Sequence, residues 1–106
     1  MISTHILDTH LGKPAAKVAI KLFSEDGTLL GEALTNTDGR VTDFGFTEFK
    51  AGAYSLEFAT SAYFEGLGLE TFFPKAVIHF YVKDASQHFH IPLLISPFAY
   101  STYRGS

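Results

Sequence analysis

The side chains best able to act as acids, bases or metal ligands are five histidines, in a chain with no cysteine. His88 and His90 are two residues apart, so on a strand they project from the same face. Such a pair can chelate zinc if a third ligand completes the site, and here that ligand would be His5, His79 or an acidic residue. The spacing alone is weak evidence for a metal site, and it favours a hydrogen-bonded or solvent-facing pair.

A histidine can also act as a general base on water, which requires a cation or donor where the oxyanion develops. Arg40 follows the Asp38-Gly39 turn and could supply that cation, since a guanidinium binds planar pairs of acceptors. His5 is a candidate base on a strand that also carries Leu7. Both residues also fit plainer roles, Arg40 as a solvated turn residue and His5 as a structural histidine.

Covalent catalysis has little support in the sequence. There is no cysteine nucleophile and no Gly-x-Ser-x-Gly motif of the kind that presents a nucleophilic serine. Ser106, the last residue of the sequence, is retained as a candidate because it ends an unusual tail.

Short alternating segments separated by turn residues predict the elements that must position these side chains. Val18, Ile20 and Leu22 fall on one face of a predicted strand, with Lys17 and Lys21 on the other. The following Asp-Gly turn predicts a hairpin. Ser61 could cap a helix of about two turns, which Gly66 would end. The predicted strands cover residues 3–8, 17–23, 28–36, 51–60, 75–84, 88–96 and 99–104.

This pattern predicts an all-β fold, a two-sheet antiparallel β-sandwich of seven to eight strands with one short α-helix. The chain of 106 residues has the length of one domain, so residues 1–106 are expected to form a single unit.

Composition narrows the function classes. The chain is 46% hydrophobic and 18% charged, which excludes a disordered protein. It has no apolar run long enough for a membrane span and no N-terminal signal, so we expect a cytoplasmic protein. The net charge of −3, with no block of Lys or Arg, argues against a nucleic-acid partner.

Three segments in order resemble one family. "STHILDTHLGKPA", "TNTDGR" and "HFHIPLLISPFAYSTYRGS" are similar to the 5-hydroxyisourate hydrolases, the purine-catabolic branch of the transthyretin-like proteins. The ending Tyr-Arg-Gly-Ser is typical of that branch and is absent from the hormone-carrying transthyretins. The resemblance covers essentially the whole chain.

The resemblance implies a transthyretin-like sandwich that assembles as a homotetramer, a dimer of dimers, with active sites where dimers meet. It implies hydrolysis of 5-hydroxyisourate, an oxidised purine, to 2-oxo-4-hydroxy-4-carboxy-5-ureidoimidazoline. No cofactor and no metal are expected.

The family motifs map onto particular residues of this chain. They imply that His5, Arg40, His90 and Ser106 are catalytic and that His5, Arg40 and Tyr103 bind the substrate. One of the two histidines, His5 or His90, would take the proton from water. The remaining histidines match no catalytic position of the family: His10, His79 and His88.

Three rival functions stay open on the sequence alone. A transthyretin-like carrier would bind a small aromatic ligand without turnover. A metallohydrolase would be built around His88 and His90. A plain interaction module would have neither turnover nor a small-molecule pocket, since a fold does not fix a function.

Overall fold

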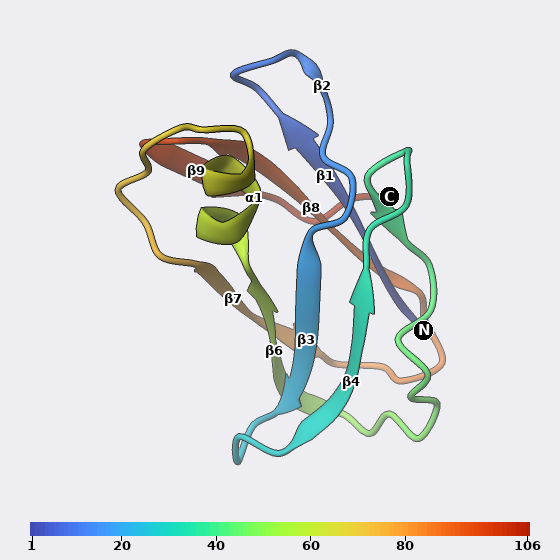
Figure 1. Cartoon of the computed structure of the whole chain (residues 1–106). Coiled ribbons are helices and arrows are strands. Elements are labelled where there is room, and N and C mark those ends of the chain that lie inside the picture. Colours follow the sequence, from blue (N-terminus) through green and yellow to red (C-terminus); the bar gives the residue numbers. More distant parts are fainter.

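A computed structural model describes all residues, 1–106, and shows two β-sheets that pack face to face, with one helix at one end (Figure 1). The elements are β1 (Ile2–Asp8), β2 (Lys13–Pro14), β3 (Ala19–Ser24), β4 (Leu29–Leu34), β5 (Arg40–Val41), β6 (Gly52–Phe58), α1 (Thr60–Gly66), β7 (Ala76–Val82), β8 (Phe89–Ser96) and β9 (Ala99–Thr102). The predicted sandwich with one short helix is confirmed. The strands outnumber the predicted seven to eight because β2 and β5 are only two residues long.

The five-stranded sheet joins the two ends of the chain. Its order is β2-β1-β8-β9, with β5 also paired to β1. The β1–β8 pair is parallel, with Ser3 opposite His90 and His5 opposite Pro92, whereas its other pairs are antiparallel. The predicted antiparallel sandwich is therefore confirmed, with this one parallel pair as its exception. Two strands separated by most of the chain can run parallel because no tight turn connects them.

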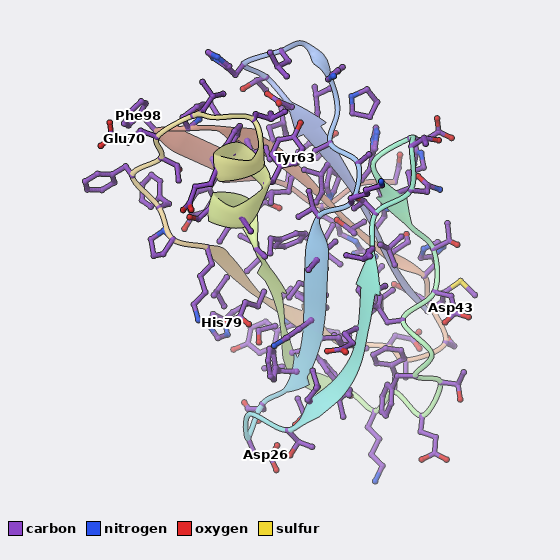
Figure 2. The ribbon with its side chains drawn as sticks, viewed as in Figure 1. Asp26, Asp43, Tyr63, Glu70, His79 and Phe98 are labelled. Atoms are coloured by element: carbon purple, nitrogen blue, oxygen red, sulfur yellow. The ribbon has the colours of Figure 1, made fainter.

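The four-stranded sheet has the order β4-β3-β6-β7 and is antiparallel throughout. The predicted β3–β4 hairpin is confirmed. Asp26 lies at its tip (Figure 2), where the carboxylate accepts hydrogen bonds from the backbone N–H and the hydroxyl of Thr28 at 3.1 and 2.8 Å. Gly27 adopts a φ of 86°, which a residue with a side chain disfavours.

The core lies between the sheets because alternate residues of each strand point inward. Ile20 and Leu22 of β3 and Leu93 and Ile95 of β8 are fully buried. Each such side chain stabilises the fold by roughly 1.5–3 kcal/mol relative to an exposed one. The two sheets consequently share one apolar interior and leave their opposite faces to the surface.

The helix is anchored by its side chains rather than by a cap. The residue at the cap position is Ala59, so the expectation that Ser61 caps the helix is wrong. The Ser61 hydroxyl instead donates to Glu65 one turn later. Phe64 is fully buried and packs the helix onto the core.

A buried carboxylate connects α1 to β1. Tyr63 projects from α1 toward β1 (Figure 2), and its hydroxyl donates to Asp8 at 2.7 Å. Asp8 is fully buried and also accepts the backbone N–H groups of His10 and Leu11 at 2.9 and 3.0 Å. Burial and the Asp8 carboxylate raise the pKa of Tyr63 well above its ordinary value.

The two termini lie on the same side of the molecule, beside the segment that carries β5 (Figure 1). None of the helical structure in this fold has the length and apolar character needed to cross a bilayer.

Candidate active site

The outer face of the five-stranded sheet carries the histidines of the candidate site. Along β1, Ile2 and Ile6 point into the core, so Ser3 and His5 point outward. Ser3 is opposite His90 in the parallel register, and His90 also lies between two inward-facing residues of β8. The outward side chains of β1 and β8 are therefore neighbours, although they are separated by most of the sequence.

Arg40 is brought to this face by the turn that precedes it. The Asn36 side chain accepts the backbone N–H groups of Asp38 and Arg40 at 2.9 and 3.0 Å. Gly39 has a φ of +71°, and a Cβ there would lie 2.5 Å from the Ile6 carbonyl oxygen. Only glycine allows this approach, which lets β5 pair with β1 and sets Arg40 opposite His5.

The last residues return along β8 and contact His90. Gly105 forms an isolated antiparallel bridge with His90, and its N–H donates to the His90 carbonyl at 2.9 Å. A Cβ on Gly105 would lie 2.5 Å from Cδ2 of the His90 ring. The neighbouring Arg104 guanidinium lies 4.8 Å from the centre of the Phe89 ring, within range of a cation–π interaction. The tail is thus held against the imidazole rather than free in solvent.

A buried hydroxyl holds the other side of that imidazole. The Ser3 Oγ atom lies 2.8 Å from His90 Nδ1 and 2.7 Å from His88 Nε2. Ser3 is only 5% exposed, whereas His88 lies at the surface. The sequence analysis did not identify Ser3 as a site residue. It placed His88 outside the catalytic set of the family. Ser3 shares an alternating face with His5, but its contact with the two histidines depends on the parallel β1–β8 pair, which no local pattern indicates.

The surroundings of His90 favour its neutral form. Burial lowers the pKa of His90 below its ordinary value of 6.5, and electrostatic repulsion from Arg40, and from His88 and His5 when they are protonated, lowers it further. A neutral imidazole at neutral pH can accept a proton, which is what a general base requires.

A cavity of about 250 Å³ opens where these groups meet. Arg40, His90 and Ser106 all line it, so the structure brings three of the predicted catalytic residues together. Its remaining lining residues are Met1, Ser3, Thr4, Thr42 and His88.

The other two predicted residues lie near this cavity without lining it. His5 is half-buried on the same face, directly opposite Arg40 in the β1–β5 pair. Tyr103 is 60% exposed and lines a second cavity of about 300 Å³, between β7 and β8, which His90 also borders. His90 therefore separates Tyr103 from the cavity that contains Arg40.

No three histidine or acidic side chains gather in a metal-binding arrangement. The pair considered as a zinc chelate, His88 and His90, instead shares the Ser3 hydroxyl through one ring nitrogen each.

These features define a class: a transthyretin-like β-sandwich with a basic, imidazole-containing cavity on the outer face of one sheet. The family model described as "HIUase/Transthyretin family" matches residues 2–105, and the chain belongs to that family. The resemblance of the three sequence motifs is thereby confirmed.

Individual relatives agree with this assignment. The chain is 43% identical to the 5-hydroxyisourate hydrolase of Caulobacter vibrioides, across 99% of this chain and 97% of that protein. The structure of Klebsiella pneumoniae 5-hydroxyisourate hydrolase superposes with a TM-score of 0.91 and 43% identity, covering 99% and 98% of the two chains. Transthyretin from Sparus aurata gives a TM-score of 0.90 at 33% identity, covering 98% of this chain and 95% of that one. The shared fold therefore includes proteins named as hydrolases and proteins named as transthyretins.

Proposed function

We propose that this protein hydrolyses 5-hydroxyisourate to 2-oxo-4-hydroxy-4-carboxy-5-ureidoimidazoline. The observation that carries the proposal is the meeting of Arg40 and a low-pKa His90 in one cavity, with Gly105 of the tail packed on the imidazole. The names of the relatives support a hydrolase that acts on 5-hydroxyisourate.

Arg40 would bind the substrate and stabilise the charge that develops during hydrolysis. 5-Hydroxyisourate is flat and rich in carbonyl oxygens, and a guanidinium offers several donors in one plane. Arg40 lines the cavity with no carboxylate paired to it, so its charge is available to an incoming oxygen. Where the cavity excludes water, that charge acts more strongly on a developing oxyanion.

His90 would supply the proton transfers. Its Nδ1 is engaged by Ser3, which leaves Nε2 as the ring nitrogen available to water. Nε2 takes a proton from water, and the resulting hydroxide attacks a carbonyl carbon of the six-membered ring. The tetrahedral oxyanion collapses, the carbon–nitrogen bond breaks, and the departing nitrogen takes the proton back from His90. His5, near both Arg40 and His90, would contact the substrate or the water from the β1 side.

We also propose that the chain assembles as a homotetramer, a dimer of dimers, and acts in the cytoplasm. A tetramer would cover the outer face of the five-stranded sheet and close the cavity. Large apolar side chains remain exposed in the isolated chain, among them Phe72 and Phe98 at 72% and 65% exposure. Light scattering coupled to size-exclusion chromatography tests the assembly. A stable monomer would contradict it.

The decisive experiment follows the ultraviolet absorbance of freshly generated 5-hydroxyisourate with and without the protein. The proposal expects accelerated decay in proportion to protein concentration. A second arm titrates an iodinated phenol, the kind of ligand that a transthyretin-like carrier would bind. Saturable binding of that phenol without any acceleration of substrate decay would favour the carrier and overturn the hydrolase.

A further inference from the structure

We propose that Ser3 and His88 form a proton relay behind His90, in which the Ser3 hydroxyl fixes the tautomer of His90 and connects it to an exposed histidine. The inference rests on the proposed function, because it assigns positioning residues for the base of that reaction. Both residues line the cavity, but the role proposed for them is indirect. Both act through the His90 ring.

The hydrogen bonds of Ser3 restrict the protonation of both imidazoles. The Ser3 Oγ atom contacts one nitrogen of His88 at 2.7 Å and one of His90 at 2.8 Å, and it has no other partner. A hydroxyl has a single proton, so it can donate to only one of them. If both rings donated to the oxygen, the buried hydroxyl proton would lack an acceptor, which is costly. One neutral imidazole must therefore donate to Ser3 and the other must accept.

The proposed role of His90 as a base determines which of these groups donates and which accepts each hydrogen bond. A base at Nε2 of His90 requires the ring proton on Nδ1, which then donates to Ser3. The Ser3 hydroxyl in turn donates to Nε2 of His88. In the opposite direction the Nε2 proton of His90 would face a cavity that already contains the donor-only guanidinium of Arg40, and no base would remain there.

The same two hydrogen bonds can also transfer a proton from His90 to His88. When Nε2 of His90 takes a proton from water, the Nδ1 proton can pass to the Ser3 oxygen while the Ser3 proton passes to Nε2 of His88. His90 is then neutral and His88 carries the positive charge, with no ring displaced. The reverse shift restores the Nδ1 proton as the Nε2 proton leaves for the departing nitrogen.

The two histidines differ in burial, and this difference favours placing the positive charge on His88. His90 is partly buried beneath the tail, whereas His88 is exposed at the surface. His88 lines the same cavity but is the more exposed of the two rings, so the positive charge loses less hydration on His88 than on His90. His88 precedes β8 and lies farther along the sheet than His90 from the paired residues His5 and Arg40. The charge of Arg40 disfavours an imidazolium at His90.

The relay is tested by measuring kcat on 5-hydroxyisourate for three variants and one control. Ser3→Ala removes the hydroxyl and is expected to lower kcat about ten- to hundred-fold, less than the ~10²–10⁴ that general acid–base catalysis contributes. Ser3→Thr keeps the hydroxyl and should stay within about threefold of the parent rate, because the relay atom is retained. His88→Phe removes the end of the relay at an exposed position, where folding is not at risk, and should also lower kcat. His10→Phe is the matched control, an exposed histidine whose ring has no partner, and should leave kcat unchanged.

Nitrogen-15 NMR of the histidine rings tests the tautomer without requiring turnover. The parent protein should show His90 protonated at Nδ1 and bare at Nε2, and Ser3→Ala should lose this preference. A His90 ring protonated at Nε2 in the parent protein would overturn the relay, as would an unchanged kcat in folded Ser3→Ala and His88→Phe. If the parent protein leaves 5-hydroxyisourate untouched while His90 shows the expected tautomer, the proposed reaction fails and the hydrogen-bond chain survives.

Discussion

The two sheets of the sandwich share one core but differ in what their outer faces contain. The four-stranded sheet carries charged side chains on its outer face, such as the exposed Lys21 and the half-buried Glu57. Glu57 forms the one ion pair of the chain, with Lys75 just before β7. Such exposed pairs contribute little to stability. The five-stranded sheet instead buries a serine on its outer face and half-buries His5 and His90 there.

The difference follows from how each sheet is assembled. The β3–β4 hairpin joins strands that are adjacent in the sequence, and β6 then adds to β3. The five-stranded sheet places β1 beside β8 and closes β8 with the tail. Side chains from four distant segments consequently meet on one face, which no local hairpin can achieve. The site lies where the long-range pairs of the fold converge.

The largest effect is expected from reversing a charge on the five-stranded sheet. Arg40→Glu should lower kcat/KM on 5-hydroxyisourate by ~10³-fold or more, because loss of one oxyanion donor alone costs about 10²–10³. Lys50→Glu makes the same change of charge at an exposed loop residue and serves as the control. Circular dichroism should show both variants folded. A near-parent rate for Arg40→Glu would remove Arg40 from the site.

Substitutions that affect the inward face of β1 should lower the stability of the fold but leave activity nearly unchanged. Asp8 points inward and satisfies Tyr63 and two backbone N–H groups, so Asp8→Ala should lower the free energy of unfolding by about 3 kcal/mol. Tyr63→Phe removes one of these bonds and should cost about 1.5 kcal/mol. Urea denaturation measures both. Below the unfolding transition kcat should change little, and a large loss of kcat in Tyr63→Phe would show that the inward face of β1 also serves the site.

A pair of glycine substitutions sharpens the contrast between the sheets. Gly105→Ala places a Cβ 2.5 Å from the His90 ring and should lower kcat about tenfold by displacing the tail or the imidazole. Gly27→Ala meets no atom within 4 Å but has a φ of +86°, so it should cost about 1 kcal/mol of stability and leave kcat unchanged. Steady-state assays and thermal melts on both variants check this. Equal effects on kcat would mean that contact with His90 is not what Gly105 provides.

The sequence predicts the local elements well because their causes are local. Alternation of Ile20 and Leu22 and the Asp-Gly turn after them determine the β3–β4 hairpin. The parallel β1–β8 pair and the Gly105 bridge depend on contacts between opposite ends of the chain, and no turn or period signals them. The helix was expected in the right place but with Ser61 as its cap, because the buried Phe64 and the bond from Tyr63 to Asp8 anchor it without one.

The same distinction holds for the candidate site. The family motifs indicated Arg40, His90 and Ser106, which line one cavity. The roles predicted for His5 and Tyr103 remain predictions, since both residues lie beside that cavity. Spacing paired His88 with His90 but could not reveal Ser3, because Ser3 contacts the two histidines through hydrogen bonds across the parallel pair.

The smallest expected effect is on the pH dependence of activity. It tests whether Arg40, on the outer face of the five-stranded sheet, helps to set the pKa of His90. Burial, Arg40, His88 and His5 all lower the pKa of His90, so its base form persists below pH 6.5. The kcat/KM of the parent should therefore fall on the acid side only below about 6.5, as His90 becomes protonated. Arg40→Gln removes one positive charge, which should move the pKa of His90 upward in an NMR titration that needs no turnover. Lys50→Gln, remote from the ring, should leave it unchanged. A His90 that titrates identically in Arg40→Gln would mean that Arg40 does not help to set the pKa of His90 and acts only on the substrate.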